Sequence, residues 1–257
     1  IMFQVIAYFR FLFASTNQHG VHSPFVYDLI TKCFYNKTEL AVYKKLDFYR
    51  ARLLTNKTRI NVTDFGAGSR LFKSPEREIA AIAKTAGITP KRAKLLARLA
   101  QYFNFDSVLE LGTSLGLASS AIAFATPKTS ITTLEGCPET AAVAKAQFEA
   151  YQLHNISPVV TDFSNYLNSS TRHYDLVYFD GNHQKDATLS YFNHLVKHVT
   201  NDTVFIFDDI HWSKDMEDAW AVLKNHPKVT ITIDTFYWGF VFFRAEHKHK
   251  EHFVIRA

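Results

Sequence analysis

The second half of the chain alternates short apolar runs with helix-forming segments, and this alternation limits the fold more than any other feature. The apolar runs are "SVLEL", "SITTLE", "SPVVT", "YDLVYFD" and "TVFIFDD", and a segment with helical character follows each of them. Such β-α repeats predict a parallel sheet with right-handed crossovers and helices on both faces. The tail "VTITIDTFYWGFVFF" holds two strands only a few residues apart, so this last pair must be antiparallel. We predict an α/β fold with a doubly wound, mostly parallel, seven-stranded sheet that ends in an antiparallel hairpin.

A change of rhythm at Thr89 suggests how the chain is divided. In "TPKRAKLLARLAQYF", Thr89 can cap a helix and Pro90 suits its first position. Before this point the sequence shows helical periodicity with aromatic faces. We therefore predict a helical extension over residues 1–88, forming a lid, substrate or dimer region, and an α/β domain over residues 89–257.

The opening "IMFQVIAYFRFLFAS" has about a dozen apolar residues interrupted by Arg10, fewer than the roughly 20 that span a bilayer. It predicts no transmembrane segment but an amphipathic helix that covers the core or a partner, such as a second copy of the chain; membrane contact is the alternative. Two cysteines are too few for a disulfide framework, which favours a reducing, cytoplasmic location. The net charge of +5 comes from scattered basic residues, so there is no clear nucleic-acid signature.

Two stretches contain the closely spaced glycines of a nucleotide-binding turn, "TDFGAGSR" and "VLELGTSLGLAS". Such a turn needs a hydrophobic strand before it, a helix after it and an acid about 20 residues on. Only the second meets all three requirements, with Glu135 lying 23 residues after Gly112. The first, over residues 63–70, is interpreted as a surface loop, or as a loop that folds over the mouth of the site.

The spacing of Gly112 and Gly116 differs from the Gly-x-Gly-x-x-Gly pattern that brings a pyrophosphate onto a helix. A ligand with a carboxylate-bearing amino-acid tail needs only exposed amides and neighbouring hydroxyls, such as those of Thr113 and Ser114.

Residues 89–244 resemble the class I S-adenosylmethionine-dependent methyltransferases, and within them the catechol O-methyltransferase-like small-molecule group. The matching segments are "VLELGTSLGLAS", "LEGCPETAAVAKAQF", "VVTDFSNYL", "YDLVYFDGNHQKDATLSYFNHL" and "VFIFDDIHWS". The resemblance implies a Rossmann-like fold and S-adenosylmethionine as cofactor. It also implies that Glu110 and the turn from Gly112 to Gly116 hold the methionine end, and that Glu135 binds the ribose hydroxyls.

The same resemblance implies that Asp162 lies by the adenine amino group, with Phe163 beside the ring. Asp162 has an alternative role as the N-cap of the helix that follows it.

Three further acids end two of the predicted strands: Asp180 in "YFDGNH", and Asp208 and Asp209 in "FIFDDIHW". Carboxylates converging at one sheet edge repel unless a cation lies between them, and oxygen ligands favour Mg²⁺ or Ca²⁺. In the resembling family a Mg²⁺-type ion chelates two substrate oxygens there. The chain has Asp-Asp where that family has Asp-Asn, and Asp208 or Asp209 can alternatively cap a helix or bind backbone.

His183 follows Asp180 by three residues and stands where catechol-type enzymes carry a lysine. Because an imidazole titrates near neutral pH, His183 is our candidate general base, and Asp180 and His183 are the predicted catalytic residues. The alternative for His183 is a role in loop packing, and His211 is a second candidate base.

The predicted function is transfer of a methyl group from S-adenosylmethionine to a hydroxyl of a small molecule, with a divalent ion such as Mg²⁺. The alternatives are a methyltransferase that acts on RNA or protein, and a non-catalytic module with the same fold.

Overall fold

The computed structural model describes residues 2–63, 65 and 74–257. The chain forms two compact units: Ile1–Tyr35 together with Leu167–Ala257 make the first, and Asn36–Tyr166 make the second. The predicted boundary between residues 88 and 89 lies inside the second unit and stays a prediction. Most of the segment "TDFGAGSR" lies outside the described residues, which include only its Thr63 and Phe65.

The second unit contains three parallel strands, in the order β3-β4-β5. They are β3 (Ser107–Leu111), β4 (Ser130–Glu135) and β5 (Ile156–Val160). The helices between and after them are α6 (Leu117–Ala125), α7 (Pro138–Ala150) and α8 (Phe163–Ser169). This is the β-α alternation predicted from the apolar runs.

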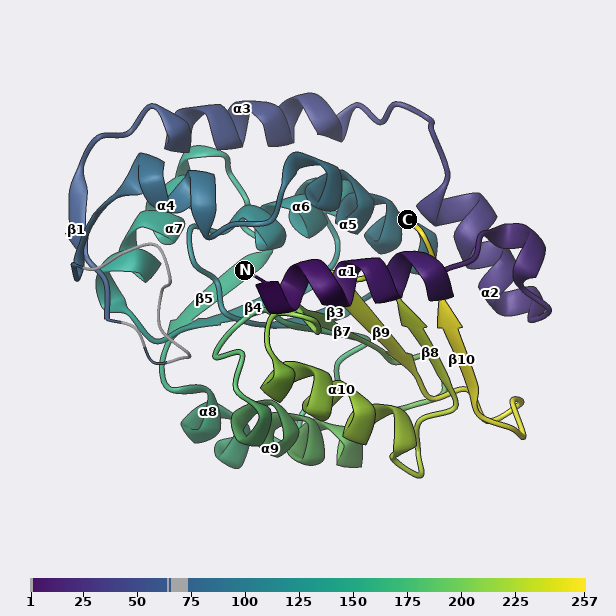
Figure 1. The fold of residues 1–257 in the computed structure, drawn as a ribbon. Helices are drawn as coiled ribbons and strands as arrows, with labels where there is room; N and C mark the ends of the chain where they lie inside the picture. Colours follow the sequence, from purple (N-terminus) through teal and green to yellow (C-terminus); the bar gives the residue numbers. More distant parts are fainter. Residues whose placement is uncertain (1, 64, 66–73) are drawn as a thin grey trace. The chain divides into compact units, whose positions relative to one another are not determined.

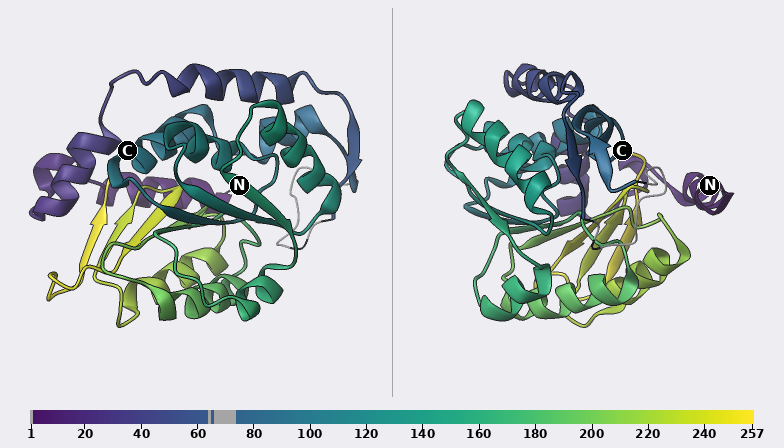
Figure 2. Two further views of the ribbon diagram at one scale, coloured as in Figure 1. Left: turned by 180° about the vertical axis from the view of Figure 1, so that it is seen from behind. Right: turned by 90° about the vertical axis from the view of Figure 1, so that its left-hand side faces the viewer.

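Three further helices of this unit are α3 (Val42–Leu54), α4 (Ile79–Thr85) and α5 (Pro90–Phe103). Helix α5 packs beside α6, and α3 lies on the side of α6 away from the strands (Figures 1 and 2). Helix α5 begins as the sequence predicts: the Thr89 hydroxyl accepts the Arg92 N–H at 3.3 Å, and Pro90 occupies the first turn. A small antiparallel hairpin of β1 (Arg59–Asn61) and β2 (Glu76–Glu78) joins α3 to α4, in a stretch where we expected no strand.

The first unit contains five strands in the order β10-β8-β9-β7-β6. Strands β6 and β7 are parallel, whereas β9 runs antiparallel to both β7 and β8. The strands are β6 (Leu176–Phe179), β7 (Val204–Asp208), β8 (Ile231–Asp234), β9 (Trp238–Phe242) and β10 (Glu251–Val254). The helices that follow β6 and β7 are α9 (Lys185–Leu195), which continues into the 3-10 turn η3 (Val196–His198), and α10 (Lys214–Asn225).

The N-terminal helices belong to this first unit. They are α1 (Met2–Ala14), the 3-10 turn η1 (Gln18–Gly20), α2 (Pro24–Leu29) and the π-helical turn η2 (Ile30–Phe34). Helix α1 buries Ala7 and Phe11 against Phe236, in the turn between β8 and β9. Among the helices that the structure describes, none has both the length and the apolar character needed to cross a bilayer.

The α/β class, the mostly parallel sheet and the antiparallel hairpin at its end are confirmed. The main sheet has eight strands rather than seven, because "EHFV" forms β10 and pairs in parallel with β8. This strand has only four residues and lies between charged segments, so its sequence carries little strand signal.

Candidate active site

The turn between β3 and α6 has the backbone geometry expected of a ligand-binding turn. Gly112 has φ 108° and Gly116 has φ 76°, both in the left-handed region. A Cβ atom at Gly116 would lie 2.4 Å from the Phe148 ring, so only glycine fits there. The N–H groups of Gly112 and Thr113 both donate to the Leu134 carbonyl at 3.0 Å, which fastens the turn to the end of β4.

Glu110 lies completely inside the unit, beneath this turn. Its Oε2 accepts bonds from the hydroxyls of Ser119 and Thr133, and Oε1 has no hydrogen-bond partner. Burial raises the pKa of Glu110 to about 7, despite the opposing effect of the two hydroxyl bonds. The Glu110 carboxyl group therefore links the first turn of α6 to β4. Its direct contact with the methionine end of a cofactor stays a prediction.

The hydroxyl of Thr113 belongs to the same interior network. Its Oγ1 lies 2.6 Å from Oγ1 of Thr133, and the residue is buried. The side chain is thus engaged inside the unit rather than at the mouth of the turn. Ser114, by contrast, is partly exposed and has φ 48°.

Glu135 ends β4 at the mouth of the turn and is partly exposed. Its Oε2 accepts the Ser114 N–H and its Oε1 accepts the Cys137 N–H, each at 2.9 Å. These two backbone bonds fix the carboxylate in place. A carboxylate has further lone pairs, so it can still accept hydrogen bonds from ligand hydroxyls.

Asp162 lies at the end of the neighbouring strand β5. The Thr161 N–H donates to the Glu135 carbonyl at 3.0 Å, so the two acids leave adjacent strand ends. One oxygen of Asp162, Oδ1, accepts the Asn165 N–H at 3.2 Å, which is the N-cap role that we considered as an alternative. The side chain is exposed and Phe163 is partly exposed, so both can also meet a ligand.

The remaining predicted residues lie in the first unit. Since Phe179 of β6 pairs with Phe207 of β7, the residues that follow them, Asp180 and Asp208, leave the same sheet edge. Asp208 is buried, while Asp209 is partly exposed and has φ 54°.

Among the described residues, no three His, Cys, Asp or Glu side chains are arranged so that they could hold a metal ion. The divalent-ion site at Asp180, Asp208 and Asp209 stays a prediction.

His183 lies beside Asp180, with 3.9 Å between Nε2 and the carboxylate Oδ1. Both Asn182 and His183 have positive φ, of 73° and 48°, so this short loop adopts an uncommon conformation. Strain of this kind at a strand end is typical of functional loops, and it is consistent with the catalytic role predicted for His183.

His211, the second candidate base, is engaged at both ring nitrogens. Nδ1 lies 2.9 Å from Glu217 and Nε2 lies 2.8 Å from Asp234, and the ring stacks on Phe236. The two carboxylates raise the pKa of His211, although burial opposes them. Because both ring nitrogens of His211 are engaged by carboxylates, neither is available to a substrate hydroxyl, so this geometry favours His183 as the base.

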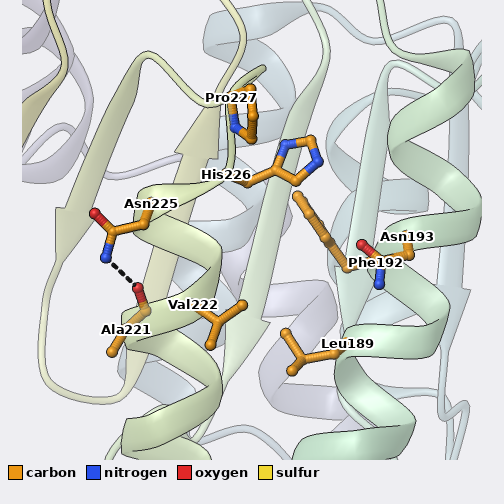
Figure 3. A pocket seen from close by; sticks show the side chains of 8 residues that line it. All are labelled: Leu189, Phe192, Asn193, Ala221, Val222, Asn225, His226 and Pro227. Carbon is orange, nitrogen blue, oxygen red and sulfur yellow. Dashed lines mark hydrogen bonds between the residues drawn. The ribbon is translucent and has the colours of Figure 1, made fainter.

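A groove of about 470 Å³ lies between α9 and α10, far along both helices (Figure 3). Its lining is mostly apolar and contains none of the predicted site residues: Leu189, Phe192, Asn193, Ala221, Val222, Asn225, His226 and Pro227. Each helix runs back from the carboxyl end of its strand, so the groove faces the opposite edge from Asp180 and Asp208. We assign it no part in the predicted chemistry.

Sequence reasoning missed two residues of the interior network, Ser119 and Thr133. The parallel register places Thr133 directly opposite Glu110 on neighbouring strands. A signal was present, because an acid inside the apolar run "SVLEL" must find polar partners once both faces of the strand are covered.

Comparison with known proteins identifies the domain. Residues 109–210 match a family model described as a methyltransferase domain. No curated protein matches the sequence.

Several solved structures share the fold. A putative O-methyltransferase from Klebsiella pneumoniae is 16% identical, with a TM-score of 0.58 over 81% of this chain and 92% of that one. An O-methyltransferase from Bacillus cereus, solved in complex with SAH, is 17% identical, with a TM-score of 0.55 over 81% of this chain and 92% of that one. A SAH-bound methyltransferase from Podospora anserina is 14% identical, with a TM-score of 0.60 over 87% of this chain and 97% of that one.

The glycine turn, the strand-end acid Glu135 and the methyltransferase domain over residues 109–210 agree with one another, and the resemblance seen in the sequence is confirmed. Residues 109–210 therefore form a methyltransferase domain, and the chain has the fold of O-methyltransferases of known structure.

Proposed function

We propose that this chain is an S-adenosylmethionine-dependent methyltransferase that acts on a hydroxyl oxygen of a small molecule, with Glu135 holding the ribose of the cofactor. The observation that supports cofactor binding is the position of the Glu135 carboxylate. The N–H groups of Ser114 and Cys137 hold it at the mouth of the glycine turn. The acids Glu135 and Asp162 at adjacent strand ends suit the two ends of an adenosine, the ribose hydroxyls and the adenine amino group.

Bound S-adenosylmethionine supplies an electrophilic methyl group on a sulfonium, which is a good leaving group. The protein then has to align the acceptor oxygen, remove its proton and exclude water. His183 is the proposed base, and Asp180 at 3.9 Å orients its ring and stabilises the imidazolium that forms.

A macromolecular acceptor is the alternative substrate class. The basic residues are scattered along the chain, and "FDGN" stands where an amino-methylating enzyme carries an Asn-Pro-Pro-Tyr-type motif. Both features favour an oxygen of a small molecule. A non-catalytic module is disfavoured by the intact glycine turn and by Glu135.

Calorimetric titration with S-adenosylmethionine tests whether the chain binds this cofactor, and we expect a dissociation constant in the micromolar range. Labelled methyl transfer into fractions of a cell extract tests the acceptor, and we expect label in a low-molecular-mass fraction. No cofactor binding at high micromolar concentration, or label only in protein or RNA, would contradict the proposal.

The divalent ion remains a separate prediction for Asp180, Asp208 and Asp209. The roles proposed above for His183 and Asp180 do not require an ion. The cytoplasmic location also remains a prediction. Methyl transfer that survives both EDTA and Asp180→Ala would remove the metal from the hypothesis.

We further propose that α1 pairs with α1 of a second copy. Its exposed apolar face, formed by Met2, Val5, Ile6, Phe9 and Phe13, includes Phe13 at 90% exposure. Met2, Ile6, Phe9 and Phe13 follow a 4-3-4 spacing, the repeat of a helix-pairing seam.

The area and charge of this face both favour a second copy over a membrane. The face presents on the order of 600 Å² of apolar surface, close to the roughly 800 Å² that each partner buries in a stable complex. Membrane-surface helices carry several basic residues, whereas α1 has only Arg10, which lies 3.5 Å from Glu217.

Light scattering after size-exclusion chromatography tests this pairing. We expect a dimer for the wild type, a monomer for Phe9→Glu/Phe13→Glu, and no change for Tyr27→Glu, which alters an exposed aromatic of α2. A monomeric wild type would contradict the pairing.

A further inference from the structure

The small hairpin of the N-terminal extension is fastened to the turn that follows Glu135. The Asn61 N–H donates to Oε2 of Glu139 at 2.7 Å, and the Thr63 N–H donates to Sγ of Cys137 at 3.4 Å. The Cys137 thiol in turn donates to the Asn61 carbonyl at 3.4 Å. Cys137 is buried and precedes α7 directly. These three contacts therefore hold the extension against the start of α7.

Phe65 lies on this same turn. A Cβ atom at Gly136 would lie 2.7 Å from Cδ2 and 2.9 Å from Cε2 of the Phe65 ring, so the ring packs directly on the glycine. Gly136 immediately follows Glu135, and its lack of a side chain is what admits the ring. Phe65 nevertheless remains 60% exposed. An aromatic ring that packs on one peptide and keeps more than half of its surface exposed offers a face on which a planar ligand can pack.

A nucleoside held by Glu135 and Asp162 must lie near the Glu135–Gly136 peptide. The two acids leave adjacent strand ends, where the Thr161 N–H is bonded to the Glu135 carbonyl at 3.0 Å. The exposed ring of Phe65 is therefore within reach of an adenosine that occupies this edge. This inference rests on the proposed function, in which Glu135 and Asp162 hold the adenosine of S-adenosylmethionine.

We propose that Phe65 is a cofactor-contacting residue whose exposed ring packs on the adenosine half of S-adenosylmethionine. The extension then contributes this ring to the cofactor site. Stacking acts on the adenosine alone, so Phe65 contributes equally to the binding of S-adenosylmethionine and S-adenosylhomocysteine.

Calorimetric titration of the full chain with S-adenosylhomocysteine tests the contact. We expect Phe65→Ala to weaken binding by about tenfold, which is typical for loss of one aromatic stack on a base. Phe65→Tyr keeps the ring and should bind as the wild type does. Phe48→Ala is the matched control, because Phe48 is an exposed phenylalanine of α3 in the same unit.

Three results are distinguishable in this titration. Binding by Phe65→Ala within twofold of the wild type overturns the proposal and leaves the methyltransferase function intact. Tighter binding by Phe65→Ala also overturns it, since the ring would then occupy the place of the nucleoside. Absence of binding by the wild type contradicts the proposed function itself.

Fluorescence gives a second readout that does not depend on affinity. The three tryptophans of the chain, Trp212, Trp220 and Trp238, all lie outside Asn36–Tyr166. Phe65→Trp therefore adds the only indole of this unit. We expect saturating S-adenosylhomocysteine to quench the added emission in Phe65→Trp, relative to the change in the wild type. No additional quenching would overturn the contact.

Discussion

The strand ends of the two units differ in how their acids are held. In the second unit, backbone N–H groups and buried hydroxyls fix Glu135 and Glu110. In the first unit, Asp208 is buried while Asp209 enters a left-handed turn, and His183 lies 3.9 Å from Asp180. Backbone donors are positioned by the fold itself, so the acids proposed to hold the cofactor are fixed before any ligand binds. The residues proposed for the acceptor depend on side chains that strand ends alone do not align.

The largest effect should come from the turn that organises the cofactor half. Gly116→Ala places a Cβ 2.4 Å from the Phe148 ring at a positive φ. Left-handed strain and overpacking together should cost about 4 kcal/mol, seen as a lower thermal midpoint and loss of cofactor binding. Gly87→Ala is the control, because its Cβ meets only the flexible end of Leu117. Equal midpoints for the two variants would show that the turn is not sterically fixed.

Glu135→Ala should weaken S-adenosylhomocysteine binding by about 100-fold. The change removes the acceptor of the Ser114 and Cys137 N–H groups as well as the proposed partner of the ribose. Hydrogen bonds to a charged group contribute about 1.5–3 kcal/mol each. Calorimetry measures the affinity, with Glu149→Ala, an exposed acid of α7, as the control. A loss below fivefold would mean that Glu135 only supports the turn.

Glu110 should make stability depend on pH. Its pKa is raised from 4.5 to about 7 in the folded state, so the protonated carboxyl favours folding. This contribution is complete below about pH 4.5 and is lost as the pH rises through about 7, amounting to about 3 kcal/mol. Urea unfolding at pH 5 and pH 8 should show this loss in the wild type relative to Glu110→Gln. Parallel pH profiles for the two proteins would refute the assignment.

His183→Ala should separate methyl transfer from cofactor binding. We expect the rate of methyl transfer to an identified acceptor to fall about 100-fold, as is usual when a general base is removed, while cofactor affinity stays unchanged. His249→Ala, an exposed histidine of the same unit, is the control. A rate within a few-fold of the wild type at neutral pH would remove His183 as the base.

Local patterns were enough to predict much of the fold. The cap and proline at Thr89–Pro90, the repeated strands and helices, and the antiparallel hairpin of β8 and β9 are signals read within a few residues. The strands β1, β2 and β10 were missed because three or four residues between charged neighbours carry no periodicity. They form because a partner strand supplies their hydrogen bonds.

The candidate site divides in the same way. The glycine turn and Glu135 could be predicted from their spacing along the chain, because a strand, a tight turn and a helix are consecutive in sequence. The partners of Glu110, the packing of Phe65 on Gly136 and the enclosure of His211 by Glu217 and Asp234 could not. These contacts join residues from separate elements.

The sequence by itself determined the order of the elements, the position of the cofactor turn and the acid that serves it, because local propensity and residue spacing encode those features. Only the tertiary structure decided which acids are buried, which histidine is hydrogen-bonded at both ring nitrogens and which aromatic ring packs on Gly136. The physical reason is that burial, pKa and close approach depend on neighbours that packing brings together, and no local spacing specifies them.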